Sequence, residues 1–255
     1  MASQDRQARK ALKQFVATDA FFGMADVPIP AAALRAAANR PSGRKSRSSV
    51  GASSGDKTTR LETLNREHVK DCRRCGLCET RNNTVFGIGS ADARLVFVGE
   101  GPGFEEDRQG IPFVGRAGQL LTKMIVAMGL TRDDVYICNI VKCRPPNNRD
   151  PAADEIAACS PYLYEQLRII GPEMIVALGA PASKTLLNTT LSIGRLRGQF
   201  HDFNLRSEDG STSTIPLMPT YHPAYLLRSP GEKGKAWEDL QKVMACLGLE
   251  IPKRS

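Results

Sequence analysis

The sequence predicts an α/β fold, a three-layer α/β/α arrangement in which helices cover both faces of a central four-stranded parallel sheet. Two observations lead to this prediction. Short apolar runs alternate along the chain with stretches of ten or more residues that have helical periodicity. These apolar runs are continuous, as expected for strands that are buried on both faces. No run of about 18 uninterrupted apolar residues occurs, so we expect no membrane span.

Four apolar runs are predicted to form the parallel strands: residues 94–99, 135–141, 174–178 and 215–219. Helices are predicted before, between and after them: residues 61–72, 118–128, 152–170, 180–187 and 237–247. Parallel sheets bind their ligands beyond the carboxyl ends of the strands. We therefore expect the functional site in the segments that follow three of these strands: GEGPG, NIVKCRPPNNR and TYHPAYLLR.

The positive charge is concentrated at the start of the chain. Residues 1–60 hold 11 Lys/Arg against 4 Asp/Glu, whereas residues 61–255 hold 24 against 23, within a total net charge of +8. Because the body is nearly neutral, the pI of about 9.2 does not by itself indicate nucleic-acid binding, which requires a local basic patch.

The composition of residues 40–60, rich in Ser, Gly and Arg, predicts a disordered linker. We therefore expect a basic, largely disordered extension over residues 1–60 and one folded domain over residues 61–255. Residues 5–22 have the pattern of a short amphipathic helix, and they are a candidate docking segment for a protein partner.

Seven cysteines are present, and the basic start of the chain is not followed by the apolar segment of a secretory signal. We expect a reducing cytoplasm and no disulfides. Cys72 and Cys75 form a CxxC pair, and Cys143 and Cys159 form a second pair further along. Four thiolates in two pairs can bind one zinc ion or an iron–sulfur cluster. A redox CxxC is the competing interpretation, but it does not explain the second pair. The spacing leaves open whether Cys78 is also a ligand.

Three separated motifs resemble the family 4 uracil-DNA glycosylases. They are VGEGPGFEEDRQGIPFVGRAGQLL at residues 98–121, VYICNIVKCRPPNNRDP at residues 135–151 and YHPAYLLR at residues 221–228. The resemblance covers residues 61–250 and leaves residues 1–60 outside. It implies a uracil-DNA glycosylase fold and an enzyme that flips uracil out of DNA and hydrolyses its N-glycosidic bond. It also implies a [4Fe-4S] cluster on four cysteines, with Cys78 excluded: Cys72, Cys75, Cys143 and Cys159.

In this resemblance, Glu100 and the backbone at Gly101 lie beside the base and the deoxyribose. The best-known glycosylase family has a water-positioning aspartate directly after the position of Glu100, where this chain has Gly101. Another carboxylate must therefore act on the water. Glu100 is the stronger candidate and Asp107 the weaker one. The resemblance also places the ring of Phe113 against the flipped uracil, although a buried phenylalanine is more often only part of the core.

Asn139 ends the second predicted strand, and its side-chain amide offers both a donor and an acceptor. This pair matches uracil O4 and N3–H and mismatches the exocyclic amine of cytosine. Asn148 is a weaker candidate for a second polar contact. The resemblance places His222 against uracil O2, where a hydrogen bond would stabilise the negative charge that develops.

The segment after His222 supplies candidates for contact with DNA. Leu226 or Leu227 would fill the gap left by the flipped base, unless both are core leucines, and Arg228 would bind a phosphate. Arg144 and Arg149 would add to a basic patch.

We expect a monomer that binds uracil-containing DNA, single- or double-stranded. Two other classes remain. A binding protein of the same superfamily would lack catalysis or trap uracil covalently, but the related covalent group carries a basic, His-containing insert that KCRPPNNRDP lacks. An electron carrier built on the cluster would not need the three pocket motifs.

Overall fold

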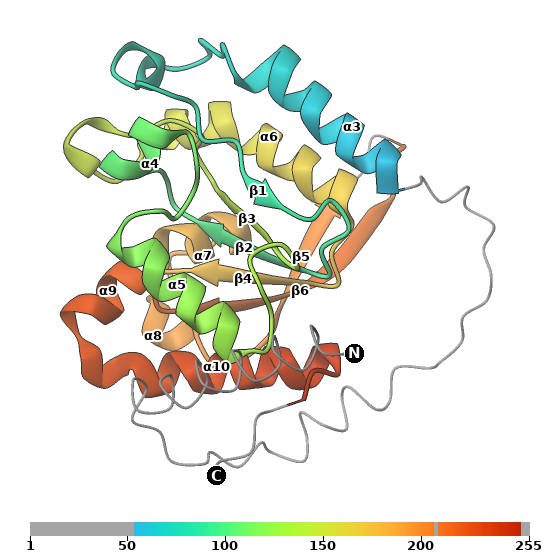
Figure 1. Ribbon diagram of the computed structural model, residues 1–255, viewed down its shortest axis with the longest axis vertical. Helices are drawn as coiled ribbons and strands as arrows, with labels where there is room; N and C mark the ends of the chain where they lie inside the picture. The colour runs from blue at the N-terminus through green and yellow to red at the C-terminus, as the bar shows by residue number, and fades with distance from the viewer. Residues whose placement is uncertain (1–53, 207–208, 251–255) are drawn as a thin grey trace, which may run out of the picture.

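The protein is described here by a computed structural model, which covers residues 54–206 and 209–250. Its centre is a six-stranded sheet in the order β1-β3-β2-β4-β6-β5 (Figure 1). The four inner strands run parallel: β2 (Leu95–Gly99), β3 (Tyr136–Asn139), β4 (Met174–Leu178) and β6 (Thr212–Thr220). The predicted parallel strands are thus confirmed, and two antiparallel edge strands are added: β1 (Ile88–Gly89) and β5 (His201–Arg206).

Helices cover both faces of this sheet (Figure 1). One face carries α5 (Arg116–Ala127) and α10 (Lys233–Leu247), and the other carries α3 (Ser54–Leu64), α6 (Ala153–Ile170) and α7 (Ala180–Leu187). Successive residues of a strand point to opposite faces. In β4, Ile175 and Ala177 accordingly join one core, and Met174, Val176 and Leu178 join the other. The predicted three-layer α/β/α class is confirmed.

Shorter helices connect these elements. They are η1 (Asn65–Val69), η2 (Gly76–Glu79), α4 (Phe104–Gln109), η3 (Pro146–Asn148), α8 (Ile193–Leu196), α9 (Pro223–Arg228) and η4 (Pro230–Glu232). Within the described ranges, no helix has both the length and the apolar character needed to cross a membrane.

The edge strand β5 was missed because it is not a continuous apolar run. Phe203 and Leu205 are buried, while Asp202, Asn204 and Arg206 between and beside them are exposed. This alternation is typical of a strand with one solvated face. The period of two was present in the sequence HDFNLR and could have predicted the strand.

Helix α3 corrects part of the linker prediction. It begins at Ser54, so residues 54–60 are helical and the predicted boundary at residue 61 falls inside a helix. Lys57 explains why this polar segment folds, because its ammonium donates to Ile170 O at 2.9 Å and lies 3.3 Å from Asp92. The rest of the predicted extension, including the candidate docking helix at residues 5–22, lies outside the described residues.

The carboxyl ends of the four parallel strands meet at one edge of the sheet. Ile140 N donates to Gly99 O at 2.9 Å and Gly179 N donates to Thr220 O at 2.8 Å, so the strand pairing continues to the last residues. The segments that follow these ends therefore converge on one place, as the sequence predicted.

Candidate active site

A groove of about 790 Å³ opens at the carboxyl ends of the parallel strands. Its walls come from the segments that follow all four of them. Eight of the residues predicted for the site line it: Glu100, Gly101, Phe113, Asn139, Asn148, Arg149, His222 and Arg228. Chain segments more than a hundred residues apart thus supply one polar and aromatic surface.

Asn139 lies on the floor of the groove with an unpaired acceptor. Its side chain is buried, and its Oδ1 is one of two buried side-chain oxygens or nitrogens without a hydrogen-bond partner among the described residues. A Cβ atom added at Gly99 would collide with this oxygen and with the ring of Phe113. Glycine at the end of β2 therefore gives the amide its space. A buried acceptor left unpaired costs about 1–3 kcal/mol, which a ligand N–H would recover.

His222 follows β6 and begins α9. Its Nδ1 accepts a hydrogen bond from Ala224 N at 3.1 Å. Burial, helped by the positive charge of Arg228, lowers the pKa of His222 to about 4. The imidazole is therefore neutral near pH 7, and because Nδ1 is an acceptor, the proton is on Nε2. His222 thus offers one fixed N–H donor to a ligand.

The ring of Phe113 lies beside this imidazole, with the two ring centroids 5.7 Å apart. Phe113 has a φ of 54°, a left-handed conformation that is rare for an aromatic residue. Glu106 and Arg132 hold this turn in place. Glu106 Oε1 accepts from Val114 N at 2.9 Å and from the next amide at 3.0 Å, and Arg132 donates to Phe113 O at 3.1 Å. Strain of this kind persists where the surroundings fix it, often at functional sites.

Glu100 follows β2 and is half-buried in the groove wall. Burial, helped by the neighbouring carboxylate of Asp150, raises the pKa of its carboxyl to about 7. Near neutral pH both protonation states of Glu100 are therefore populated. The sequence analysis missed Asp150 as well as Glu106 and Arg132. Asp150 directly follows a predicted residue in the second motif and Glu106 lies within the first motif, whereas Arg132 lies outside all three.

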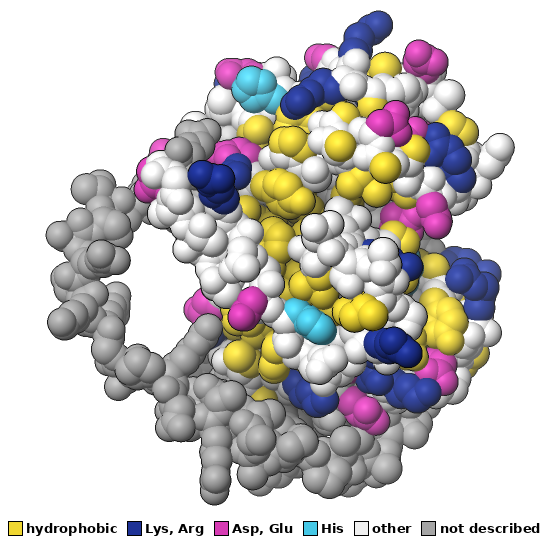
Figure 2. All heavy atoms as spheres, turned by 180° about the vertical axis from the view of Figure 1, so that it is seen from behind, with side chains coloured by type: hydrophobic (Ala, Val, Ile, Leu, Met, Phe, Trp, Pro, Cys, Tyr) yellow, Lys and Arg dark blue, Asp and Glu magenta, His cyan; other side chains and the backbone are white. Residues whose placement is uncertain are grey.

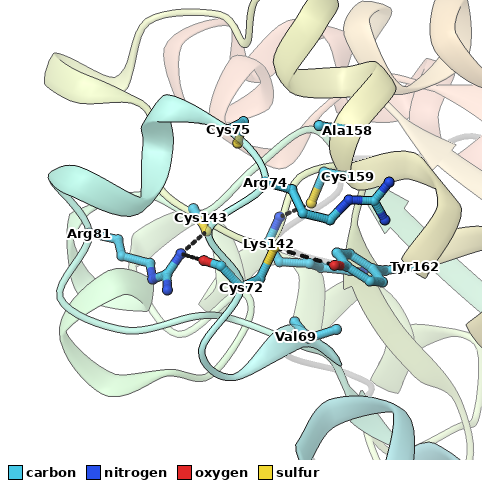
Figure 3. Close-up of a pocket in the computed structure, with 10 residues that line it drawn as sticks. All are labelled: Val69, Cys72, Arg74, Cys75, Arg81, Lys142, Cys143, Ala158, Cys159 and Tyr162. Atoms are coloured by element: carbon cyan, nitrogen blue, oxygen red, sulfur yellow. Dashed lines mark hydrogen bonds between the residues drawn. The ribbon is translucent and has the colours of Figure 1, made fainter. Parts of the chain in front are cut away.

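The four predicted metal ligands line a second, separate pocket: Cys72, Cys75, Cys143 and Cys159. Figure 3 shows their side chains around a common space, brought together from the segment before β1, the turn after β3 and helix α6. Cys78 is not among the lining residues.

Polar groups contact three of these four sulfur atoms. Arg81 donates to Cys143 Sγ at 3.2 Å, the backbone N of Lys142 donates to Cys159 Sγ at 3.2 Å, and the Tyr162 hydroxyl lies 3.3 Å from Cys72 Sγ (Figure 3). Burial raises the pKa of the free Cys143 thiol to about 11, so it would ionise only when bound to a metal. The donor set therefore fits a group held by four thiolates. In the described part of the chain, no three His, Cys, Asp or Glu form a group placed to hold a single metal ion.

The profile of the family described as the uracil DNA glycosylase superfamily matches residues 86–241, more than half of the chain. The chain belongs to this superfamily. It is 47% identical over 187 residues to a type-4 uracil-DNA glycosylase of Thermotoga maritima, a match that covers 72% of this chain and 93% of the relative. The type-4 uracil-DNA glycosylases of Saccharolobus solfataricus and Archaeoglobus fulgidus are 45% and 40% identical, over 71% and 75% of this chain and 84% and 96% of their own lengths.

Two residues predicted for this glycosylase site are placed elsewhere. Asp107 does not line the groove, and its fully buried carboxylate accepts from Asn82 N at 2.9 Å, Asn82 Nδ2 at 2.5 Å and Asn83 N at 3.3 Å. Its position fits a structural role that fixes this loop to α4, and not the predicted catalytic role. Leu226 has no exposed surface and belongs to the core under α9, which contradicts its predicted insertion into DNA.

The remaining DNA-contact candidates differ in their surroundings. Arg228 is exposed at the groove, whereas Leu227 is half-buried against the core. Arg149 pairs with Glu155 at 2.6 Å, so its charge is largely compensated. Arg144 donates to Asn148 Oδ1 at 2.7 Å, and its guanidinium lies 5.1 Å from the ring centroid of Phe104.

Phe104 is a rim residue that the sequence analysis missed. Its side chain is 56% exposed, and it directly follows Gly103, which lines the groove. On the face turned away in Figure 1, acidic and basic side chains are interspersed around a band of apolar ones (Figure 2).

Proposed function

We propose that this chain is a monofunctional uracil-DNA glycosylase, which binds uracil flipped out of DNA, hydrolyses its N-glycosidic bond and leaves an abasic site for base-excision repair. The observation that carries the proposal is the buried Oδ1 of Asn139, which no described residue contacts by a hydrogen bond, in the same groove as the neutral imidazole of His222. The type-4 uracil-DNA glycosylases that this chain resembles support it.

Base recognition is assigned to Asn139 and Phe113. The Asn139 Oδ1 accepts from uracil N3–H, and its amide nitrogen donates to O4. Cytosine offers an acceptor at N3 and an amine in place of O4, so both contacts become repulsive. A buried polar group left unpaired costs about 1–3 kcal/mol, which discriminates strongly between the two bases. The ring of Phe113 stacks on the base and adds affinity without selecting its identity.

Bond cleavage is assigned to His222 and Glu100. As the bond between the base and the sugar breaks, negative charge develops on uracil O2 and positive charge on the deoxyribose. His222 Nε2–H donates to O2, and because the imidazole is neutral it does so without transferring a proton. Ionised Glu100 stabilises the sugar cation and orients the attacking water. A carboxyl with a pKa near 7 is suited to this work near neutral pH.

A [4Fe-4S] cluster is proposed on Cys72, Cys75, Cys143 and Cys159. The four thiols share one pocket, and N–H donors of the kind that tune such clusters already contact two of the sulfur atoms. When bound, the cluster supplies a covalent cross-link between the segment before β1, the turn after β3 and helix α6. No step of the hydrolysis requires it to change oxidation state.

Contact with DNA is assigned to the rim of the groove. Arg228 and Arg144 bind phosphates, while Leu227 and the exposed ring of Phe104 contact bases next to the flipped nucleotide. We propose that the protein acts as a monomer on DNA in the cytoplasm. No disulfide joins any of its seven cysteines, which fits a reducing compartment.

A single-turnover assay tests the function directly. Oligonucleotides with one uracil, single-stranded or paired with G or A, are incubated with iron-loaded protein, and abasic sites are cleaved with alkali. We expect cleavage at uracil and none at cytosine or thymine in matched oligonucleotides. No abasic product with excess enzyme would contradict the proposal, and a protein–DNA adduct that survives denaturation would favour covalent trapping.

A further inference from the structure

Lys142 is a buried cation between the two pockets. It is 1% exposed, lies three residues after Asn139 and directly precedes Cys143. Its ammonium donates to Asn139 O at 2.9 Å and to Gln166 Oε1 at 2.6 Å. Its backbone N donates to Cys159 Sγ at 3.2 Å, and its backbone O accepts from Val85 N at 2.7 Å. One residue thus contacts both Asn139, at the end of β3, and the cysteine pocket.

The partners of this ammonium are neutral. Among the described residues, no carboxylate forms a salt bridge with Lys142. Burial of an ammonium costs stability unless its charge is offset, and the sulfur atoms of Cys138 and Cys159 are the groups that favour its charged form. A lysine at this position therefore links the charge of the cysteine pocket to the Asn139 carbonyl that its ammonium holds.

Gln166 on α6 fixes the direction of that hydrogen bond. It is fully buried, and its Nε2 donates to Phe86 O at 2.9 Å and to Tyr136 Oη at 3.0 Å. With both amide hydrogens used, its Oε1 must face Lys142. The ammonium is consequently held from α6 while it holds the last residue of β3.

We propose that Lys142 is a positioning residue for uracil recognition, which orients Asn139 and mechanically joins the uracil groove to the cysteine pocket. The inference rests on the proposed function and deepens it. The ammonium fixes the peptide of Asn139, and the same residue is fixed to helix α6 through Cys159 and Gln166. Its positive charge also lies next to the residue that contacts the base on which negative charge develops, which favours the departing anion.

Lys142→Met tests this role, because it keeps the length of the side chain and removes the charge and both hydrogen bonds. Lys57→Met is the matched control. Lys57 also donates to a backbone carbonyl, that of Ile170 at the end of α6, but Lys57 itself lies on α3, away from the groove. For each protein we would measure the dissociation constant of free uracil, the single-turnover rate, iron per chain and the affinity for DNA with an abasic site.

We expect Lys142→Met to weaken uracil binding and to slow cleavage, each by about tenfold or more, as for the loss of a hydrogen bond to a charged group. Affinity for abasic DNA, which has no base to read, should stay within about twofold, and iron content should be retained. Lys57→Met should match the wild type in all four. A purely structural lysine would lower thermal stability and leave uracil affinity per folded molecule unchanged.

Uracil affinity of folded Lys142→Met within about threefold of the wild type would overturn the proposal. If this variant does not fold, Gln166→Met decides, because it leaves Lys142 in place and removes only the hydrogen bond from its ammonium to Gln166. We expect Gln166→Met to weaken uracil binding less than Lys142→Met does. Unchanged uracil affinity in Gln166→Met would overturn the proposal. Wild-type protein that neither binds nor cleaves uracil would instead refute the proposed function itself.

Discussion

The two pockets lie on either side of one turn, yet they differ in how their polar atoms are satisfied. In the groove, neither Asn139 Oδ1 nor the Nε2–H of His222 has a hydrogen-bond partner among the residues that the structure describes. In the cysteine pocket, Arg81, Lys142 and Tyr162 already contact three of the four sulfur atoms. This difference fits the two proposals, a ligand that enters and leaves the groove and a permanently bound group in the cysteine pocket.

The largest effect is expected in the groove. His222→Ala should lower the single-turnover rate on uracil by about 10²–10³, because it removes the donor to the developing oxyanion. Iron content and Tm should stay near those of the wild type, since the cysteine pocket is separate. His201→Ala is the matched control, because His201 lies on the edge strand β5 and bonds to Leu196 O. Loss of iron from the His222 variant would show that the cysteine pocket depends on this imidazole.

A substitution in the cysteine pocket should instead lower the iron content and the Tm. Cys143→Ala should lose most of the iron and the absorbance near ~400 nm, and its Tm should fall by ~5 °C or more because a cross-link is lost. Cys78→Ala should keep both, since Cys78 does not line the pocket. Iron analysis and thermal unfolding of the three proteins measure this. A colourless wild type with one zinc, purified without oxygen, would contradict the cluster.

Much of this comparison was predictable from the sequence. Continuous apolar runs predicted the four parallel strands. The cysteine spacing left Cys78 open, and the resemblance to the family 4 glycosylases predicted which four thiols meet. The neighbours of a side chain in space were not predictable. Asp107 and Glu106 are adjacent in α4, but one accepts from Asn82 and the other from Val114. A pattern of residues does not show which of two neighbouring carboxylates faces the groove.

The same limit applies to the adjacent leucines of α9 and to Lys142. Leu226 and Leu227 are adjacent and chemically identical, so only the packing of α9 shows that Leu226 is in the core. Lys142 has the charge of an ordinary surface residue in the sequence. Its burial follows from helix α6, whose residue Gln166 is 24 positions away in the chain.

A smaller effect, which sharpens the comparison inside the groove, is expected from Glu100→Gln. Because the pKa of Glu100 is about 7, kcat/KM of the wild type should rise with pH through this value as the carboxyl ionises. The variant should be slower above pH 7 and lack this limb of the profile. If kcat/KM of the variant still rises with pH through about 7, this rise belongs to a group other than Glu100.

The same pKa has a consequence for stability. A carboxyl with a raised pKa binds its proton more tightly in the folded state, so the free energy of unfolding falls as pH rises from about 4.5 through 7. Glu100→Gln should therefore be more stable than the wild type at pH 8, by about 1 kcal/mol or less after solvent screening, and not at pH 4. Denaturant unfolding at the two pH values measures this difference.

The smallest effect is expected from removing residues 1–53, which should leave both pockets unchanged. These residues hold 9 Lys/Arg against 3 Asp/Glu, and α3 begins directly after them, so the truncated protein keeps every described helix and strand. Basic side chains bind phosphates by releasing counterions, without reading sequence. DNA affinity of the truncated protein should therefore be lower by a few fold at low salt, with the same preference for uracil. The difference should shrink as salt rises, because the Debye length falls to ~8 Å at physiological ionic strength.

If residues 5–22 dock a protein instead, the two forms will bind DNA equally and with parallel salt slopes. Iron content and the cleavage rate at saturating enzyme should be identical in both, and a change in either would mean that the extension contacts one of the pockets.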